Sequence, residues 1–335
     1  MTAATTPTGG WPVAIAGLGA RLPDRVVTND DLAEVLDTSD EWIRTRTGIR
    51  ERHVAAPEEA TSDLATAAAR DALRDAGLAA TDLAAVIVAT TSPDHQVAAT
   101  APLVASALGV TAPAFDLNAA CSGFVYALRV ASGMVATGDG AVLVIGAETL
   151  TRIADPEDRS TAVLFGDGAG AVVLVPDDDA RLGPFSLGAD GEGASMLWTP
   201  SGGTRRPFDA EVLADRSHYL SMRGGDVYRN AVVRMADSAR EVLAQAGLEV
   251  ADVDLLVGHQ ANVRILDAVA ARLGLPNELS HISVDRHGNT SAASIPLALV
   301  DARAQGKLRD GATVLLAAFG AGLTWGACLL TWKER

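Results

Sequence analysis

The residue of this 335-residue chain with the clearest potential for chemistry is Cys121, in the segment FDLNAACSGF (115–124). A thiol just before a helix can act as a nucleophile, because free backbone N–H groups and the helix dipole lower its pKa. Ser122 and Gly123 leave room beside the sulfur for a substrate carbonyl. The alternative is a buried structural thiol, which is common for free cysteines. The second cysteine, Cys328, lies in the apolar run GACLLTW, which predicts a core residue.

Two further segments repeat the arrangement of strand end, small residues and helix. LLVGHQANVRI (255–265) carries His259, and SVDRHGNTSAAS (283–294) carries Asn289. Because ligands of open α/β proteins gather at the carboxyl ends of strands, we expect both residues to lie near Cys121. A lone histidine is often structural, and asparagine after glycine is common in turns. No histidine or cysteine spacing is typical of a metal site, so we expect no metal.

The elements that must position these residues are short apolar strands alternating with helices. Continuous apolar runs predict strands buried on both faces and therefore a layered α/β fold. The predicted strands are 13–19, 84–91, 141–148, 169–175, 253–260 and 312–320. The predicted helices are 61–76, 97–108, 122–137, 226–246, 262–273 and 291–305. Four of them stop at a glycine, namely Gly77, Gly109, Gly247 and Gly274.

The chain also resembles itself. Three segments match three later ones in the same order: 70–91 with 240–261, 140–148 with 311–319, and 165–175 with 319–330. The matches predict two copies of one α/β unit, over 1–176 and 177–335, with a Gly/Pro-rich insertion at about 184–222 in the second. We expect the two sheets to share a central helix layer. Helix 122–137 is apolar nearly all round, as such a layer requires, except for Arg129, which needs a partner.

Composition excludes several classes of protein. The net charge of −15 argues against a nucleic-acid partner. Two cysteines rule out a disulfide framework and fit a reducing compartment, and no apolar run reaches membrane-spanning length, so we expect a cytoplasmic protein. The glycine-rich segments GLGARL (17–22) and FGDGAG (165–170) lack complete nucleotide-binding patterns and are interpreted as tight turns.

Six motifs, in order along the chain, resemble those of β-ketoacyl-acyl-carrier-protein synthase III of the thiolase-fold superfamily. They are DEWIRTRTGIRERH (40–53), AACSGF (119–124), DRSTAVLFGDGAGA (158–171), GHQANVRI (258–265), HGNTSAAS (287–294) and FGAGLTWG (319–326). The resemblance, from about residue 11 to 333, implies a thiolase-like five-layer αβαβα fold of two duplicated halves and a homodimer. It also implies condensation of an acyl-CoA primer with malonyl-acyl-carrier protein, which starts fatty-acid synthesis without a permanently bound cofactor.

The resemblance also implies roles for individual residues. Cys121 would attack the acyl-CoA thioester, and the backbone N–H groups of Cys121 and Ala321 would form an oxyanion hole. His259 and Asn289 would donate hydrogen bonds to the malonyl thioester carbonyl, where decarboxylation generates enolate charge. This set suits condensation better than hydrolysis, which needs a base that activates water.

Two binding regions follow from the same resemblance. The CoA site would comprise Trp42, Arg46, Arg159, Asn262, Gly224 and Tyr228. An indole and guanidinium groups suit an adenine ring and phosphates. Acyl carrier protein would dock on Gln260, Ala261, Asn262, Val263, Arg264 and Arg229. These arginines would give the acidic chain a local basic patch for an acidic partner, although simple solvation explains Arg229 equally well.

One departure concerns the primer. Val97 of TTSPDHQV stands where acetyl-specific relatives have phenylalanine, so the pocket would admit branched or longer primers. The alternatives are a same-fold starter-unit synthase or acyltransferase of polyketide biosynthesis, a cysteine thioester hydrolase on another fold, and a non-catalytic acyl-binding scaffold. A thiolase proper would need a second catalytic cysteine, and Cys328 has the wrong context.

Overall fold

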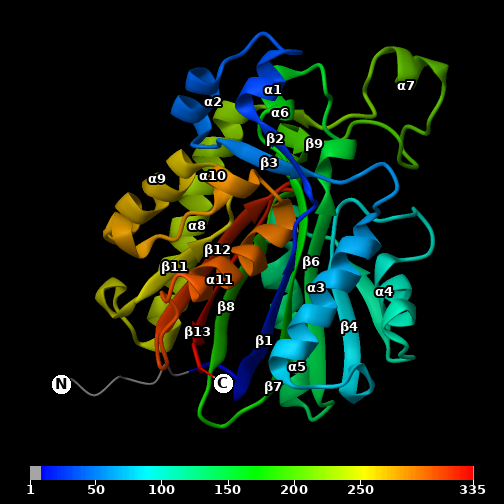
Figure 1. Ribbon diagram of the computed structural model, residues 1–335. Helices are drawn as coiled ribbons and strands as arrows, with labels where there is room; N and C mark the ends of the chain where they lie inside the picture. The colour runs from blue at the N-terminus through cyan, green and yellow to red at the C-terminus, as the bar shows by residue number, and fades with distance from the viewer. Residues whose placement is uncertain (1–8, 335) are drawn as a thin grey trace.

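Two mixed β-sheets are the framework of the computed structural model, which describes residues 9–334 (Figure 1). The first has the order β1-β7-β6-β4-β5: β1 (Val13–Arg21), β7 (Asp167–Pro176), β6 (Ala141–Thr149), β4 (Leu83–Ala89) and β5 (Ala114–Leu117). The second has the order β11-β12-β13-β8: β11 (Leu255–Gly258), β12 (Thr313–Gly320), β13 (Thr324–Thr331) and β8 (Leu182–Ala189). These are the continuously apolar segments of the sequence, and most of their residues are buried.

The strand orders of the two sheets correspond. Read from β8, the second sheet has the order β8-β13-β12-β11, and the repeated segments of the sequence fall on equivalent strands. In the second sheet, a parallel bridge between Leu256 of β11 and Ser280 occupies the position that β5 has beside β4 in the first sheet. This correspondence supports the two-copy division after residue 176, which stays a prediction. The predicted insertion 184–222 was placed too early, because residues up to Ala189 belong to β8.

Helices form three layers around the sheets (Figure 1). The outer layers are α3 (Thr61–Ala76) with α4 (Thr100–Leu108), and α8 (Gly224–Ala246) with α9 (Val263–Leu273). Between the sheets, α5 (Gly123–Ala136) and α11 (Ser294–Ala304) pack in one continuous hydrophobic core. The predicted glycine stops are confirmed, since α3, α4, α8 and α9 each end at a left-handed glycine.

Helix α5 is less completely enclosed than its composition suggests. Arg129 and Val130 are exposed, so one side of the helix reaches the surface of the central layer. The guanidinium carbon of Arg129 lies 4.0 Å from the centre of the Trp11 ring, which is the partner that the sequence did not identify. Cys328 is fully buried in β13, as its apolar context predicts.

Most residues of the two glycine-rich segments belong to strands β1 and β7, which corrects their interpretation as tight turns. Gly17 and Gly19 lie in β1 directly against α3. A Cβ atom would stand 2.2 Å from the Ala72 carbonyl oxygen at Gly17, and 2.0 Å from the Ala68 carbonyl oxygen at Gly19. The glycines therefore let the helix backbone approach the strand closely.

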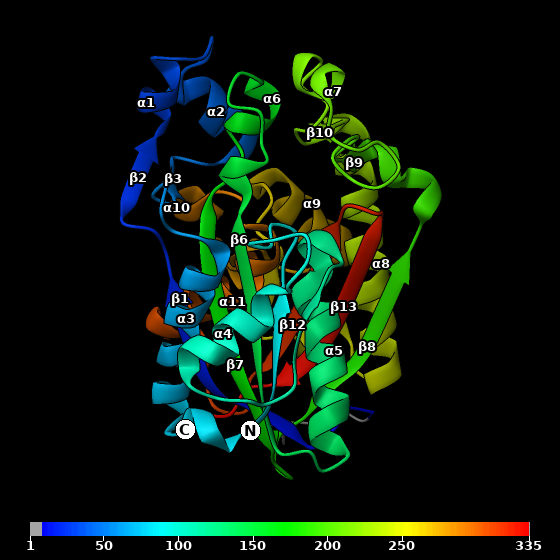
Figure 2. The same ribbon diagram turned by 90° about the vertical axis from the view of Figure 1, so that its right-hand side faces the viewer.

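Smaller elements gather at one end of the molecule, at the top of Figures 1 and 2. One group follows β1: β2 (Arg25–Thr28), α1 (Asn29–Ala33), α2 (Asp40–Thr47) and β3 (Glu51–Val54). Another follows β8: β9 (Leu197–Trp198), α7 (Ala210–Ala214) and β10 (Ser221–Met222). The short helices α6 (Arg159–Ala162) and α10 (Val284–His287) complete the set. Within residues 9–334, no helix has the length and apolarity to cross a bilayer.

Candidate active site

One cavity of about 940 Å³ brings together residues from both halves of the chain. Its wall includes Cys121, His259, Asn289 and Ala321, which are far apart in the sequence. Leu150, Ile153, Phe165, Leu197, Leu220 and Phe319 make much of the rest apolar. A mostly apolar cavity with a few convergent polar groups is suited to an acyl substrate with a polar head.

Cys121 lies in the short 3₁₀ turn η2 (Ala120–Ser122), between β5 and α5. Ala120 has a left-handed backbone with φ of 48°, and its N–H donates to the Asn118 side-chain oxygen at 3.1 Å. The turn therefore places the thiol at the cavity wall immediately before the helix. The position before a helix predicts a lowered pKa for this thiol. The structure shows the opposite direction, because burial raises the pKa of Cys121 to about 12.

A second turn of the same shape carries Asn289. Ser291 has φ of 47°, and its N–H donates to the Asn289 side-chain oxygen at 2.9 Å. The turn η7 (Ser291–Ala293) then leads into α11, as η2 leads into α5. Because Oδ1 of Asn289 accepts this bond, the amide nitrogen is the atom left to donate toward a ligand.

His259 follows β11 and is 3% exposed. Its backbone N–H donates to the Ala317 carbonyl at 2.8 Å, which fixes the residue beside the end of β12. Burial lowers the pKa of the imidazole to about 3, so the ring is neutral at physiological pH. Within the described residues its Nδ1 has no hydrogen-bond partner. A neutral imidazole presents one N–H donor and one acceptor.

The turn after β12 joins the cysteine turn through Thr324. The Thr324 hydroxyl oxygen lies 2.8 Å from the Ser122 hydroxyl oxygen and 2.9 Å from the Ala321 carbonyl oxygen. Gly320 lies so close to the cysteine turn that a Cβ atom there would stand 2.6 Å from the Cys121 backbone nitrogen. A side chain at position 320 would therefore obstruct the Cys121 N–H.

The other wall residues form an aromatic and cationic region. The guanidinium carbons of Arg46 and Arg159 lie 4.4 and 4.6 Å from the centre of the Trp42 ring. Asn262 caps α9 by accepting from the Arg264 N–H at 2.8 Å, and its amide donates to the Arg46 carbonyl at 3.1 Å. The cavity lining includes Trp42, Arg46, Gly224, Tyr228, Arg229, Ala261, Asn262 and Arg264, but not Arg159.

Comparison with known proteins places the chain in a family. A curated relative from Streptomyces coelicolor, beta-ketoacyl-[acyl-carrier-protein] synthase III 3, is 54% identical over 325 residues, covering 95% of this chain and 96% of that protein. Family models described as 3-oxoacyl-[acyl-carrier-protein (ACP)] synthase III and as its C terminal match residues 115–191 and 243–332. The chain belongs to the 3-oxoacyl-[acyl-carrier-protein] synthase III family.

Solved structures agree with this assignment. The 3-oxoacyl-[acyl-carrier-protein] synthase III of Aquifex aeolicus VF5 matches with a TM-score of 0.89 at 44% identity, covering 96% of this chain and all of that one. The priming beta-ketosynthase of the R1128 polyketide biosynthetic pathway matches with a TM-score of 0.90 at 37% identity, covering 97% of both chains. The family, the thiolase-like α/β fold and the acyl-transferring activity predicted from the motifs are confirmed.

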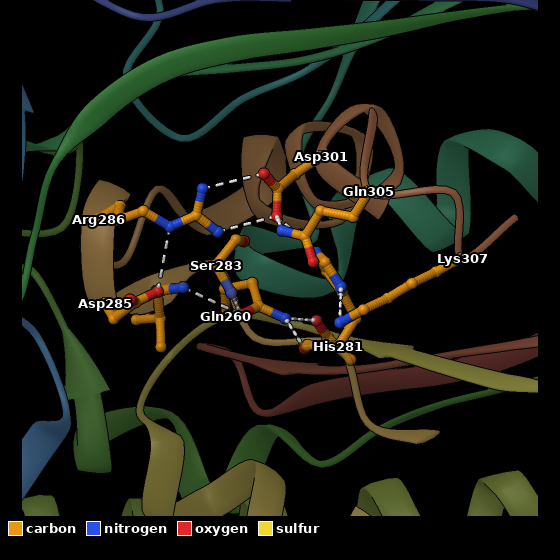
Figure 3. Close-up of polar contacts among 10 residues, drawn as sticks. Gln260, His281, Ser283, Asp285, Arg286, Asp301, Gln305 and Lys307 are labelled. Carbon is orange, nitrogen blue, oxygen red and sulfur yellow. Dashed lines mark hydrogen bonds and ion pairs between the residues drawn. The ribbon is translucent and has the colours of Figure 1, made fainter. Parts of the chain in front are cut away.

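Gln260 does not have the surface position expected of a docking residue in this synthase. It is 1% exposed, and its amide nitrogen donates to the carbonyls of Gly258 and His281 at 2.9 and 3.0 Å. Its side-chain oxygen accepts from the N–H groups of Ser283 and Val284 at 2.8 and 3.1 Å. Figure 3 shows the side chain inside this polar cluster. Its neighbour Val263, also predicted to dock, is half-buried against the core beside α2 and is absent from the cavity wall.

Val97 also lies elsewhere than predicted. It precedes α4 and is 89% exposed, and the cavity wall of its own chain does not include it. The cavity of its own chain therefore does not support a role of Val97 in the primer pocket, and that role stays a prediction. Leu150, Ile153 and Phe165 pack together in the apolar part of the cavity wall.

Sequence reasoning missed a buried polar pair in the synthase site. Glu148, at the end of β6, is fully buried, and Ser291 is 2% exposed. Ser291 lines the cavity with Cys121, and the Glu148 carboxylate accepts from the Ser92 hydroxyl at 2.6 Å. The internal repeat could have indicated Glu148, because this acidic residue aligns with the apolar Phe319 of the second copy. Within residues 9–334, no group of His, Cys, Asp and Glu side chains could hold a metal ion.

Proposed function

We propose that this synthase transfers an acyl group from acyl-CoA to Cys121 and condenses it with malonyl-acyl-carrier protein, initiating fatty-acid synthesis. One observation carries the proposal: Cys121, His259, Asn289 and Ala321 line a single apolar cavity that also includes Trp42. Free CoA and CO2 are released. Both acyl-CoA and the malonyl carrier protein are substrates, and no bound cofactor is needed.

In the acylation step, the Cys121 sulfur attacks the thioester carbonyl. The backbone N–H groups of Cys121 and Ala321 would stabilise the oxyanion of the tetrahedral intermediate. Two features support this role: Thr324 holds the two turns together, and Gly320 leaves the Cys121 N–H unobstructed. Collapse of the intermediate expels CoA and leaves a thioester on Cys121.

In the condensation step, His259 and Asn289 would donate hydrogen bonds to the malonyl thioester carbonyl. Loss of CO2 places enolate charge on that oxygen, and two donors fixed in a buried site stabilise it. The neutral state of His259 and the amide orientation of Asn289 support this role. The enolate carbon then attacks the acyl group on Cys121, and the β-ketoacyl product leaves on the carrier protein.

The binding residues divide into two groups. CoA would contact Trp42, Arg46, Arg159, Asn262, Gly224 and Tyr228. The carrier protein would meet Ala261 and the exposed Arg264 and Arg229, which form the basic patch that a chain of net charge −15 needs for an acidic partner. Gln260 is removed from this group because its side chain is buried.

A homodimer in the cytoplasm completes the proposal. Phe115, on the edge strand β5, is 37% exposed, and the exposed Val130 lies on the neighbouring α5. Such apolar surface beside an unpaired strand edge supports pairing with a second copy.

The small number of cysteines, two in 335 residues, supports a location in the reducing cytoplasm.

Intact-mass measurement tests the nucleophile. The protein is incubated with a panel of acyl-CoAs, and the mass added to wild type is compared with that added to Cys121→Ala. We expect one acyl adduct on wild type and none on the variant. An adduct that persists in Cys121→Ala would remove Cys121 from the mechanism. Free acid formed continuously without carrier protein would favour a thioester hydrolase.

A second candidate is a starter-unit synthase or acyltransferase of polyketide biosynthesis. The similarity to the R1128 priming beta-ketosynthase favours it. The two functions differ in whether the acyl group is condensed, so release of CO2 from malonyl-carrier protein distinguishes them. Stoichiometric CO2 with each β-ketoacyl product supports condensation, whereas acyl transfer without CO2 supports an acyltransferase.

A further inference from the structure

All four hydrogen-bonding positions of the Gln260 side-chain amide are taken by backbone groups of the same chain. Its nitrogen donates to the carbonyls of Gly258 and His281, and its oxygen accepts from the N–H groups of Ser283 and Val284. A primary amide has two N–H donors and one oxygen with two lone pairs, so none of its capacity remains for a partner protein. Three of the four contacts lie at least 21 residues further along the chain. The side chain therefore joins two distant segments.

The first of these segments is the end of β11, which carries His259. On one side of this strand lies β12, where the His259 N–H donates to the Ala317 carbonyl at 2.8 Å. On the other side Leu256 forms a parallel bridge with Ser280. Beyond that bridge the amide of Gln260 connects the two segments, as an inserted peptide group would. It therefore holds the backbone of His259 on the side away from β12.

The second segment leads to Asn289 by two routes. Along the chain, it continues into α10, and Asn289 follows two residues after this helix ends. Through side chains, a ring nitrogen of His281 lies 2.8 Å from Asp301, and Arg286 donates to both oxygens of the same carboxylate at 2.9 Å. Asp301 lies on α11, the helix that follows the turn of Asn289. Figure 3 shows these side chains and Gln260 in one cluster.

The polar groups of this cluster are matched donor to acceptor. The Lys307 ammonium lies 3.3 Å from Nδ1 of His281, and an ammonium can only donate. Nδ1 therefore accepts, and Nε2 carries the proton that is donated to Asp301. His281 is fully buried, and the amide of Gln305 adds a bond of 2.8 Å to the Asp301 carboxylate. The segment is thus fixed on α11 and gives Gln260 a rigid support.

We propose that Gln260 is a positioning residue that sets the placement of His259 relative to Asn289 for the condensation step. The inference rests on the proposed function, in which both residues donate to one carbonyl oxygen. Such donors must lie about 2.7–3.1 Å from the developing charge, and a misplacement of about 1 Å costs about 10²-fold in rate. The N–H of Asn289 also donates to the Leu164 carbonyl at 2.8 Å, so this residue has a second support. Loss of the Gln260 amide should therefore displace His259.

The acylation step depends on other contacts. Cys121 lies in the turn before α5, and the hydroxyls of Ser122 and Thr324 join this turn to the one after β12 at 2.8 Å. The amide of Gln260 bonds neither of these turns. A change at Gln260 should therefore slow the loss of CO2 while leaving the transfer of an acyl group to Cys121 intact.

Separate measurement of the two steps tests this role in Gln260→Met, which keeps an unbranched side chain of similar length but removes all four hydrogen bonds. Acylation of Cys121 by acyl-CoA is followed by intact mass in single turnover. Release of CO2 from malonyl-carrier protein is followed on the acylated enzyme over a range of carrier-protein concentrations. We expect CO2 release at least tenfold slower at saturation, with acylation and the KM for malonyl-carrier protein within threefold of wild type.

Two control variants separate positioning from general damage. Gln305→Met makes the same chemical change at the other end of the cluster, where the amide contacts Asp301. Leu64→Ala opens a cavity in the core beneath α3 and so lowers stability far from Gln260. Both controls should keep the wild-type ratio of the two rates. If Gln260→Met does not fold, Gln260→Glu replaces it, since this residue has the same shape but offers at most one donor. The same selective loss is expected.

Each contrary result has its own meaning. A rise confined to the KM for malonyl-carrier protein would make Gln260 a docking residue, and equal losses in both steps would make its role purely structural. Either result, or wild-type rates in both steps, would overturn the proposal. His259→Ala is measured alongside. Wild-type CO2 release in His259→Ala would reject the proposed donor itself, whereas slow release there and wild-type release in Gln260→Met would reject the positioning role alone.

Discussion

Gly320→Ala should remove the oxyanion hole while leaving the thiol in place. The added Cβ would stand 2.6 Å from the Cys121 nitrogen and 3.0 Å from the Ser122 nitrogen. Unstrained contacts between carbon and other heavy atoms lie near 3.5–4.0 Å, so roughly 1 Å of movement is needed at a turn that Thr324 ties to its neighbour. The methyl group would also crowd the Cys121 N–H that is proposed to donate to the oxyanion.

The magnitude follows from the loss of one oxyanion donor. Such a loss costs about 10²–10³ in rate, or about 3–4 kcal/mol of transition-state stabilisation. Overpacking adds a stability cost of about 1–3 kcal/mol, which a domain of ordinary stability tolerates. Single-turnover acylation of Cys121 by acyl-CoA should therefore slow by at least a hundredfold, while the protein remains folded by circular dichroism.

Two comparisons make the experiment specific. Alkylation of Cys121 by iodoacetamide forms no oxyanion, so its rate in Gly320→Ala should stay within a few-fold of wild type. Gly191→Ala is the matched control, because a Cβ at Gly191 meets nothing within 4 Å. Acylation of Gly320→Ala within threefold of wild type would refute the reasoning, and equal losses of acylation and alkylation would indicate general displacement of the turn.

Three further predictions concern other parts of the site. The folded pKa of His259 is about 3, below the value near 6.5 in an unfolded chain, so the unfolded state takes up the proton first as the pH falls. When the pH is lowered from about 7 to about 5, the unfolding free energy of wild type should therefore fall by about 2 kcal/mol more than that of His259→Asn. Denaturant unfolding at the two pH values measures the difference. An equal loss in both proteins would contradict a buried neutral His259. Gln260→Ala should lower the unfolding free energy by about 2–4 kcal/mol without changing KM for carrier protein, because its side chain bonds buried backbone groups. Arg264→Ala should raise that KM without lowering stability, because this arginine is exposed. The reverse pattern would show that Gln260 belongs to the docking surface. Trp42→Ala should raise KM for acyl-CoA by about 5- to 30-fold with little change in kcat, and an unchanged KM would exclude stacking on this indole.

Much of the fold could be predicted because it depends on local patterns. Helix α3 has the predicted bounds, Thr61–Ala76, since its apolar spacing and terminal glycine are both local signals. The buried strands were visible as continuous apolar runs, and the internal repeat predicted two copies of one α/β unit, which agrees with the corresponding strand orders of the two sheets. The strand ends that carry Cys121, His259 and Asn289 then pointed to one site.

The features that the sequence did not reveal share a cause, because each depends on contacts between distant segments. Gln260 lies in the same HQAN segment as His259, but only the backbone of residues 281–284 makes it a structural residue. Val97 was assigned by alignment, and its exposure follows from where the loop before α4 lies. Arg129 found its partner in Trp11, more than a hundred residues away.

The sequence by itself determined which residue types stand at the strand ends, the order of the elements and the family. Only the tertiary structure decided the electrostatics of the site. The position before a helix suggested a lowered pKa for Cys121, yet its burial between the two sheets raises that pKa. Solvation depends on everything that surrounds a group, whereas sequence spacing reports only its neighbours along the chain.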